Sequence, residues 1–385
     1  MVRAINRRSV VEAIAHHGAL SRSQVARAVG LSKPTTSEVV TGLLAAGLIR
    51  EAGSTHGTQG PKAVLYEVND SAAHVIGIDL GRRWVRAAVA DLSGRIIARH
   101  DERARLRSNQ TLLDQIGDVA RTVMREKGID WPQVAQVVVG SPGVADPVRG
   151  VVMLPANLPG WERQGMIESI RARFEAPVKI ENDVNLAALG ELTQGHGRQT
   201  GDFAYLWIGT GVGLGLVING RLHRGAHGLA GEIGFLPITA DPEFAATRWP
   251  RWFASPAVQE ATDRLAAARE MTNPPTLRTV FSLARKGDPL AREVVDVVAG
   301  LVARAVSTVA GVVDPEMIIL GGGVGHNGDL LLHPIEMALR SLTPLSVQVV
   351  TSALGTDAVL HGAVGTATSA AWDTLLAESA TSEND

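Results

Sequence analysis

Residues 208–235 have the sequence IGTGVGLGLVINGRLHRGAHGLAGEIGF, and this stretch decides the fold. An apolar run at 204–208 leads into a glycine-rich turn at 209–213, and a second apolar run follows at 214–218. Glycines at such a turn let the backbone approach a ligand closely and point its N–H groups at that ligand. The pattern therefore predicts a β-hairpin that holds a ligand at its turn.

The same plan occurs earlier in the chain. Apolar runs at 75–81 and 85–90 form a first hairpin, and a third run at 95–98 follows a turn at 91–94. Two such hairpins, about 130 residues apart, indicate an internal duplication in which one hairpin opens each of two lobes. A third glycine cluster, at 321–325, follows a buried strand and precedes a helix, where it either packs against a nucleotide base or turns a corner.

Residues 1–68 have the pattern of a winged helix-turn-helix. After a first amphipathic helix, Ser21 begins a capping box that starts the second helix, and Ser32 is the N-cap of a third. Two short helices joined by a turn of this length form a helix-turn-helix. Strand-like runs at 48–51 and 64–68 enclose a loop rich in turn-forming residues, which predicts a β-hairpin wing.

The third helix is predicted to expose short hydroxyl side chains and a lysine in its first turns, which suit base edges and phosphates in a major groove. Residues 1–50 hold seven Lys/Arg and two Glu, a net charge of +5, whereas the whole chain carries −2, so the remaining residues sum to −7. A basic head on an acidic body predicts that only the head binds a polyanion. The alternative is a small helical domain that docks a protein. The candidate DNA contacts are Lys33, Thr35, Thr36 and Ser37 in the helix and Lys62 in the wing.

Length and composition exclude several classes of protein. With 385 residues, 45% of them apolar and 20% charged, the chain is expected to fold into two or three domains. No apolar run approaches the roughly 20 residues of a membrane span, and the first ten residues lack the apolar segment of a secretory signal. The absence of cysteine excludes disulfides, thiol catalysis and cysteine-ligated zinc. We expect a cytoplasmic protein with no membrane partner.

The glycine-rich stretch at 208–235 resembles the ROK family (repressors, open reading frames and kinases), and the resemblance extends over nearly the whole chain. Further blocks that resemble the family are VGSPG at 139–143, NLPGW at 157–161 and ENDVN at 181–185. The resemblance implies an α/β, actin-like, two-lobed sugar-kinase fold with a sugar in the cleft between the lobes. In this chain the winged helix-turn-helix precedes that fold.

The resemblance also implies a domain organisation and an assembly. Family members with an added winged helix are typically sugar-responsive transcriptional regulators that form dimers or tetramers, so a homodimer or homotetramer is implied here. The last helix either stays in the second lobe or returns to the first, and residues 377–385 are expected to be disordered. The expected domains are a DNA-binding domain at 1–68, an N-terminal lobe at 72–190 and a C-terminal lobe at 191–385.

Several side chains are implied to bind the sugar. In the kinases of this family the aspartate at the place of Asp183 is the general base, which accepts a sugar hydroxyl proton during attack on the γ-phosphate. A carboxylate there can also bind hydroxyls without catalysis. Asn182 and Asp183 are otherwise explained as a helix N-cap, and Glu232 as a solvated turn residue. The implied sugar-binding residues are Asn157, Asn182, Asp183 and Glu232, with Asp183 catalytic only if the chain is a kinase.

Three departures from the family pattern bear on activity. The first hairpin has Arg82 and Arg83 where the kinases carry a glycine and a threonine, so a close backbone approach and a hydroxyl donor are lost. Phe235 takes the place of the zinc-binding histidine, and the zinc-binding cysteines are missing. The glutamate that follows the last of those cysteines is missing too. We therefore expect no structural zinc and no bound ATP, and we interpret these positions as a vestigial nucleotide site: Asp79, Gly81, Gly209, Thr210, Gly211, Gly213, Gly322 and Gly323.

These observations predict a sugar-responsive DNA-binding transcriptional regulator, most simply a repressor, rather than an enzyme. Its expected partners are double-stranded operator DNA and a small-molecule sugar. The alternative is an active ATP-dependent sugar kinase with an appended DNA-binding domain, since the second hairpin keeps its glycines and Asp183 is present. A third hypothesis is a regulator that senses a partner protein instead of a sugar.

Overall fold

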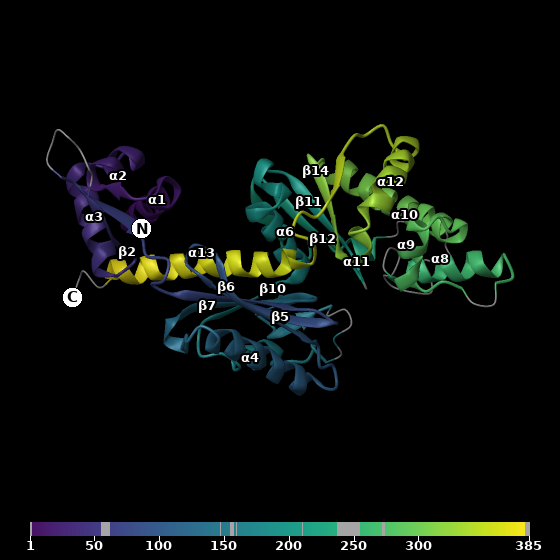
Figure 1. Cartoon of the computed structure of the whole chain (residues 1–385), viewed down its shortest axis with the longest axis horizontal. Coiled ribbons are helices and arrows are strands. Elements are labelled where there is room, and N and C mark those ends of the chain that lie inside the picture. The colour runs from purple at the N-terminus through teal and green to yellow at the C-terminus, as the bar shows by residue number, and fades with distance from the viewer. Residues whose placement is uncertain are drawn as a thin grey trace. The chain divides into compact units, whose positions relative to one another are not determined.

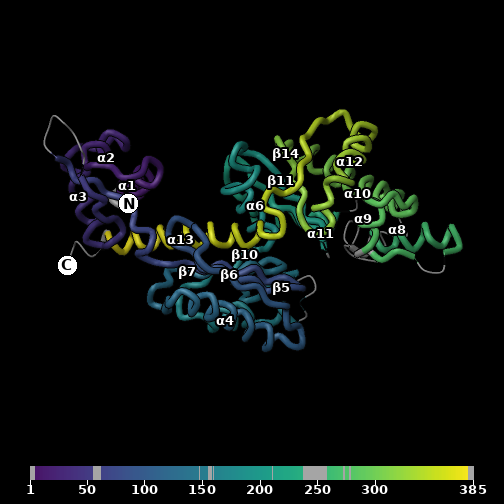
Figure 2. The backbone as a smooth tube through the Cα atoms, viewed as in Figure 1, coloured from purple at the N-terminus to yellow at the C-terminus, as the bar shows by residue number. Residues whose placement is uncertain are grey.

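The chain folds as two compact units. Unit 1 comprises residues 1–139, 168–179 and 364–385, and unit 2 comprises residues 140–167 and 180–363. Figures 1 and 2 trace the chain from the N-terminal head to the last helix, α13. The computed structural model describes residues 2–54, 62–146, 148–154, 158, 160–209, 211–236, 255–271 and 274–381.

Unit 1 begins with the predicted winged helix-turn-helix, which the structure confirms (Figure 1). Its elements are α1 (Val2–His17), β1 (Leu20–Ser21), α2 (Arg22–Val29), α3 (Lys33–Ala45), β2 (Ile49–Ser54) and β3 (Val64–Val68). The strands pair in the order β1-β3-β2. As predicted, a capping box at Ser21 starts α2, and Gly30 ends it with a φ of 70°, a conformation that glycine adopts without strain. The side chains of the head core are Val10, Val11, Ile14, Val25, Val39, Val40, Leu43, Leu48, Ile49 and Tyr66.

The body begins with a five-stranded sheet. Its strands are β4 (His74–Leu80), β5 (Trp84–Asp91), β6 (Ile96–Arg103), β7 (Val134–Ser141) and β10 (Val178–Asn182), in the order β10-β7-β4-β5-β6. The first three strands form the predicted antiparallel hairpin and its extension, with His74 opposite Asp91. Helix α4 (Asn109–Arg125) packs against this sheet with one buried apolar face. The strand β4 is buried along its whole length.

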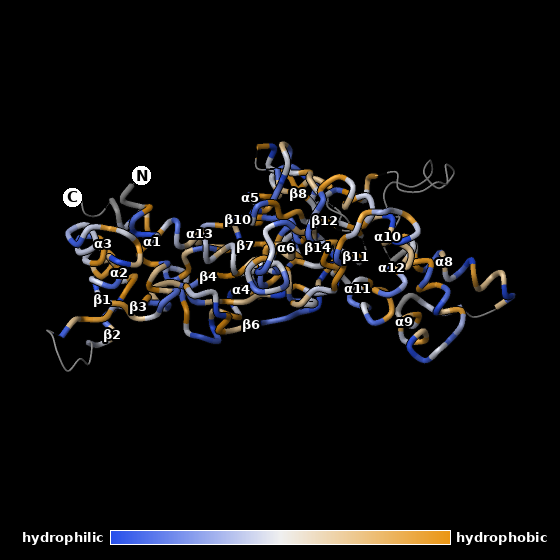
Figure 3. The backbone as a smooth tube through the Cα atoms, turned by 90° about the horizontal axis from the view of Figure 1, so that it is seen from above, coloured by the Kyte–Doolittle hydropathy of each residue, from blue (hydrophilic) through white to orange (hydrophobic). Residues whose placement is uncertain are grey.

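Unit 2 contains a second five-stranded sheet with the same topology. Its strands are β11 (Phe203–Ile208), β12 (Val212–Ile218), β13 (Arg221–His223), β14 (Met317–Gly321) and β15 (Gln348–Thr351), in the order β13-β12-β11-β14-β15. If the strands are numbered along the chain within each sheet, both sheets have the order 3-2-1-4-5. This repeat confirms the predicted duplication. Figure 3 shows the apolar character of β11 and β14 at the centre of the second sheet.

Helices complete unit 2. Helix α6 (Asp183–Gln194) packs against β11 and β12, and the long helix α10 (Pro289–Val313) packs against its helical neighbours. Among the described residues, α10 is the one helix long and apolar enough to cross a membrane by length and composition. Many of its apolar side chains, among them Val294, Val298 and Val302, are buried in the core of unit 2. The neighbours of α10 are α8 (Ser255–Ala267), α9 (Leu277–Arg285) and α12 (Gly328–Leu342).

The last helix, α13 (Ala358–Thr381), starts in unit 2 and continues into unit 1. There Leu376 is part of the head core, and Trp372 donates a hydrogen bond of 2.9 Å from Nε1 to the carbonyl oxygen of Leu92. Residues 377–381, which we predicted to be disordered, belong to this helix. The predicted disorder at 382–385 lies outside the described residues.

Candidate ligand site and nucleic-acid interface

The start of α6 places Asn182 and Asp183 at the end of β10. Asn182 is the N-cap of the helix: its Oδ1 accepts a hydrogen bond of 3.0 Å from the Asn185 N–H, while its Nδ2 donates to the carbonyl oxygen of Gly143. The capping role that we considered from the sequence is therefore real. Asp183, the first helical residue, presents a partly exposed carboxylate at the helix N-terminus, where the helix dipole favours negative charge.

Two glycines of β12 bring α6 onto the sheet. A Cβ atom at Gly213 would lie 2.8 Å from Cγ2 of Val184, and one at Gly215 would lie 2.7 Å from Cβ of Ala188. Such distances are too short for a real side chain, so only glycine permits this approach. Because Val184 follows Asp183 directly, this packing fixes the position of the Asp183 backbone relative to β12.

Glu232 is tied to the same stretch of β12 by a third glycine. Gly231 has a φ of 89°, and its carbonyl oxygen accepts a hydrogen bond of 3.1 Å from the N–H of Leu214, the residue between Gly213 and Gly215. The Glu232 carboxyl group is partly buried, and this burial raises its pKa above the ordinary range. Residues 213–215 of β12 therefore contact both Val184, which follows Asp183, and Gly231, which precedes Glu232.

An ion pair that we did not predict lies beside these residues. The Glu181 Oε2 accepts hydrogen bonds from Nε and Nη2 of Arg224, at 3.1 and 2.6 Å. The other oxygen of Glu181 accepts from the N–H of Asn182 and from Nδ2 of Asn185. Glu181 and Arg224 both lie in stretches that resemble the family, but no local pattern indicated that they pair.

The predicted nucleotide residues of unit 1 are engaged within the protein. Asp79 is almost fully buried, and one of its carboxylate oxygens accepts a hydrogen bond of 2.7 Å from Nη1 of Arg86. Gly81 donates its N–H to the carbonyl oxygen of Trp84, which closes the hairpin turn. An arginine beside Asp79 neutralises a carboxylate that we had assigned to nucleotide binding.

In unit 2 the predicted phosphate turn is closed on itself. The Gly209 N–H donates a hydrogen bond of 2.9 Å to the carbonyl oxygen of Gly211. The indole Nε1 of Trp207 lies 2.7 Å from where a Cβ atom of Gly209 would be. Gly322 has a φ of 79°, and a Cβ atom there would lie 2.4 Å from the carbonyl oxygen of Ile208. Gly209 and Gly322 are therefore explained by chain packing, and Gly323 has open space around it.

Part of the predicted site lies outside the described residues. This applies to Asn157 and Thr210. Phe235, at the position expected for a zinc-binding histidine, lies in a short 3₁₀ helix (Ile233–Phe235) and is partly buried. Within the described part of the chain, no three His, Asp or Glu side chains lie close enough to hold a metal ion.

The predicted DNA-binding helix is α3, and its first turn places Lys33 in solvent. Thr35 is partly exposed, and its hydroxyl pairs with that of Ser32 at 2.8 Å. Thr36 was wrongly predicted to be exposed. It is completely buried, and its hydroxyl donates to the carbonyl oxygen of Ser32, so it cannot contact a base. Lys62 is exposed and lies two residues before the second wing strand β3, in the wing as predicted.

Ser37 is held by an arginine that the sequence did not single out. The Arg22 guanidinium donates to both the hydroxyl and the carbonyl oxygen of Ser37, and its Nε donates to the Tyr66 hydroxyl at 3.2 Å. Arg22 thereby joins α2, α3 and the wing strand β3 in one rigid arrangement. Its place at the first position of α2 gave no signal for this role, because its partners lie 15 and 44 residues away.

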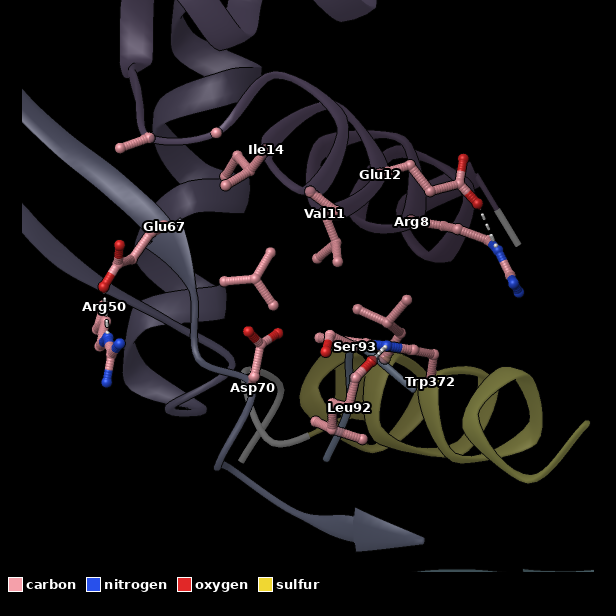
Figure 4. A pocket seen from close by; sticks show the side chains of 15 residues that line it. Arg8, Val11, Glu12, Ile14, Arg50, Glu67, Asp70, Leu92, Ser93 and Trp372 are labelled. Atoms are coloured by element: carbon pink, nitrogen blue, oxygen red, sulfur yellow. Dashed lines mark hydrogen bonds and ion pairs between the residues drawn. The ribbon is translucent and has the colours of Figure 1, made fainter. Parts of the chain in front are cut away.

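A cavity of about 480 Å³ lies in unit 1 where α1, the link to the body and α13 meet (Figure 4). Arg8 of α1 pairs with Glu12 and with Asp373 of α13. Asp70 points into the cavity, and burial raises the pKa of its carboxyl group. Trp372 and Leu92 lie on the same side of the cavity as Asp70, facing α1. The head is thus joined to α13 by the Arg8–Asp373 ion pair at this cavity and by the apolar core around Leu376.

Comparison with known proteins agrees with this architecture. The ROK family profile matches residues 75–369, and the MarR family profile matches residues 7–57 within the head. The xylose repressor of Caldicellulosiruptor bescii is 26% identical over 355 residues, which cover 88% of each chain.

Two solved structures are similar over different shares of the chain. A ROK family transcriptional regulator, a homolog of the E. coli MLC protein, has a TM-score of 0.78 at 22% identity and covers 98% of both chains. A ROK family glucokinase from Streptomyces griseus, in complex with glucose and AMPPNP, has a TM-score of 0.65 at 26% identity. It covers 76% of this chain and 99% of its own. The first similarity extends over the winged helix as well as the body.

Proposed function

This chain belongs to the ROK family, and we propose that it is a sugar-responsive DNA-binding transcriptional regulator, most simply a repressor. The observation that carries the proposal is a winged helix whose hydrophobic core includes Leu376 of α13, a helix that starts in the ligand-binding unit. A DNA-binding head and a ligand-binding unit are therefore connected by one continuous helix. The similarity to a xylose repressor over 88% of the chain supports the same function.

The proposed ligand is a neutral monosaccharide. Val184 and Gly231, which adjoin Asp183 and Glu232, contact neighbouring residues of β12, and carboxylates accept the hydroxyl hydrogens of sugars. The names of two similar proteins, a xylose repressor and a glucokinase in complex with glucose, support this class of ligand. Asn182 supports the site mainly as the N-cap that starts α6.

We further propose that the chain neither transfers phosphate nor holds ATP or structural zinc. Asp79 is paired with Arg86, and the N–H of Gly209 is already bonded to the backbone of its own turn. Two arginines, Arg82 and Arg83, lie within the first hairpin turn, between β4 and β5. Kinase activity is the competing proposal, because Asp183 is accessible and a glucokinase is among the similar proteins.

Helix α13 offers a route from the sugar to the head. A Cβ atom at Gly190 of α6 would lie 2.4 Å from the carbonyl oxygen of Ala358, and one at Gly362 would lie 1.7 Å from that of Leu186. The backbones of α6 and of the start of α13 are therefore in direct contact, so a shift of α6 moves α13. Sugar changes DNA affinity only if it binds one arrangement better than the other.

The proposed assembly is a cytoplasmic homodimer or homotetramer. A dimer that reads two half-sites needs its recognition helices about 34–36 Å apart, or a multiple of that spacing. A small displacement of α13 in each subunit would change this spacing and weaken operator binding.

The test begins with selection of an operator from random double-stranded DNA by the full-length protein. Fluorescence anisotropy then follows operator binding while D-xylose, D-glucose and N-acetyl-D-glucosamine are added, and a coupled assay follows ATP consumption. We expect one sugar to change operator affinity without ATP turnover. Failure to select any DNA rejects the regulator, indifference to every sugar rejects the sensor, and sugar-dependent ATP consumption establishes the kinase.

A further inference from the structure

The Glu181–Arg224 ion pair connects the two parts of the proposed sugar site. The side chain of Glu181 is only 9% exposed, whereas that of Arg224 is 44% exposed. Glu181 lies at the end of β10, two residues before Asp183. Arg224 lies just after β13, eight residues before Glu232. The pair therefore joins the segment that carries one carboxylate to the segment that carries the other.

Arg224 is also fixed to the Glu232 segment through its backbone. Its carbonyl oxygen accepts a hydrogen bond of 3.1 Å from the N–H of Ala230, which closes the loop 224–230. Gly225, with a φ of 72°, lets the loop fold back so that a Cβ atom there would lie 3.2 Å from that of Ala230. Gly231, next in the chain, bonds to Leu214. A displacement of Arg224 is therefore expected to displace Glu232 as well, because the two residues belong to one short, closed loop.

At the other end, Glu181 is fixed to the start of α6. Its Oε1 accepts hydrogen bonds of 3.2 Å from the Asn182 N–H and from Nδ2 of Asn185. The carboxylate thus bonds to residues on both sides of Asp183 while its second oxygen holds the guanidinium. A shift of Arg224 is transmitted to the helix start that places Asp183.

We propose that Arg224 is a positioning residue for the sugar, which sets the separation between the Asp183 and Glu232 carboxylates through its ion pair with Glu181. This inference rests on the proposed sugar site and adds to it a residue that need not touch the ligand. The segment of each carboxylate is also tied to β12, one through the Val184 side chain packed on Gly213 and the other through the hydrogen bond between Gly231 and Leu214. The ion pair connects the two segments to each other directly.

Replacement of Arg224 is expected to loosen both segments. A carboxylate that is largely removed from water and loses its cationic partner must rotate toward solvent, take up a proton or remain destabilised. Lysine keeps the charge but cannot present two donors from one rigid plane, so it should restore only part of the function.

Arg285 provides a matched control. It donates to Asp329 at 2.6 Å from Nε and 2.7 Å from Nη2, and the pair spans 44 residues, against 43 for Glu181 and Arg224. Its side chain is 43% exposed, close to the value for Arg224. Arg285→Ala therefore removes another two-donor ion pair from the same unit, between α9 and α12, in which the Asp329 side chain is 54% exposed where that of Glu181 is 9% exposed.

The first experiment needs no ligand. Hydrogen–deuterium exchange of the full chain is compared for wild type, Arg224→Ala, Arg224→Lys and Arg285→Ala. We expect Arg224→Ala to speed amide exchange in both 182–186 and 229–233, Arg224→Lys to do so less, and Arg285→Ala to leave both segments unchanged. Faster exchange at only one of the two segments, or at neither, overturns the proposed connection whatever the sugar does.

The second experiment measures sugar affinity by thermal shift with D-xylose, D-glucose and N-acetyl-D-glucosamine. For the sugar that stabilises wild type, we expect Arg224→Ala to raise the dissociation constant about tenfold, which corresponds to about 1.4 kcal/mol. Arg285→Ala should bind as wild type does. Glu181→Ala and the double variant Glu181→Ala/Arg224→Ala complete a mutant cycle. The loss of sugar affinity in the double variant should be smaller than the sum of the losses in the two single variants. Additive losses, or equal losses in the Arg285→Ala control, overturn the proposal.

Failure of the proposed function and failure of the positioning role of Arg224 give different results. If wild type binds none of the sugars, the proposed function fails and Arg224 has no sugar to position. If wild type binds a sugar and Arg224→Ala binds it equally well, the sugar site stands and the positioning role of Arg224 fails. Operator binding without sugar, measured in parallel, should stay within about twofold of wild type for Arg224→Ala, which excludes general misfolding as the cause.

Discussion

Arg7 and Ser379 are 372 residues apart in the sequence, yet Nη1 of Arg7 donates a buried hydrogen bond of 2.9 Å to Oγ of Ser379. Arg7 belongs to the first helix of the head and Ser379 to the last turn of α13. Together with the Arg8–Asp373 ion pair, this bond attaches the winged-helix head to α13, the helix that starts in unit 2. Movement of α13 must therefore carry the head with it or break these bonds.

Loss of the Ser379 hydroxyl should weaken this attachment. Ser379→Ala removes a buried acceptor from a charged donor, so we expect the free energy of unfolding to fall by about 1.5–3 kcal/mol in chemical denaturation. Thr374→Ala is the control, because its exposed hydroxyl donates to the carbonyl oxygen of Ala370 in the same helix. Equal stability of the two variants would show that the buried bond contributes nothing.

Lys33 and Lys62 are predicted to contact phosphates. Each contact releases counterions, so Lys33→Ala and Lys62→Ala should each lower the slope of log affinity against log salt by about 0.9. The expected loss of affinity is similar for specific and nonspecific DNA. Lys127→Ala, an exposed lysine of the body, is the control. A salt slope that is the same in all four proteins would remove these two residues from the interface.

Asp183 is predicted to bind the sugar without catalysis. Asp183→Asn removes a charged hydrogen-bond acceptor, whose loss costs about 1.5–3 kcal/mol, so the sugar concentration that changes operator affinity should rise at least about tenfold. Operator titrations with and without sugar measure this, with Asp296→Asn on the exposed face of α10 as control. A response to sugar at the wild-type concentration would show that the sensor lies elsewhere.

Burial of Glu232 predicts a pH-dependent effect on stability. Since its pKa is raised in the folded protein, the ionised form at neutral pH is destabilising, and this cost disappears below the unfolded pKa of about 4.3. Glu232→Gln should therefore be more stable than wild type at pH 7 and equal to it near pH 4. The exposed Glu316→Gln is the control. A difference that grows as the pH falls would contradict the sign of the shift.

The purified protein is predicted to contain no stoichiometric zinc. The chain has no cysteine, and Phe235 stands where the family pattern has a histidine. Elemental analysis after dialysis should find far less than one zinc ion per chain. A tightly held equimolar zinc ion would contradict the prediction that the residues near Phe235 form no zinc site.

Local patterns predicted the secondary structure near Ser21, Gly30 and the two glycine hairpins. Capping boxes and glycine turns depend on neighbours within about four residues, so the sequence contains the whole interaction. The duplication was visible because each sheet begins with its own hairpin. The start of α6 was also predictable. The side chain of Asn182, which we predicted to bind the sugar, caps this helix.

The burial of Thr36 could not be predicted from the sequence of its helix. It follows Thr35 in the same helix turn and has the same chemistry, but tertiary packing buries it, and its hydroxyl bonds to the preceding turn. Which side of α3 is covered depends on the other elements of the head, and the helix sequence alone does not say which of two adjacent threonines will face solvent.

The sequence by itself determined the winged helix and the duplicated sheets, because these follow from local propensity and from motifs, whereas the roles of Asp183 and Glu232 in sugar binding stay predictions from the family resemblance. Only the tertiary structure decided the Glu181–Arg224 and Arg7–Ser379 pairs and the neutralisation of Asp79 by Arg86. The physical reason is that a hydrogen bond or an ion pair needs two side chains to approach within about 3 Å, whereas sequence spacing does not specify where distant segments lie in a folded chain.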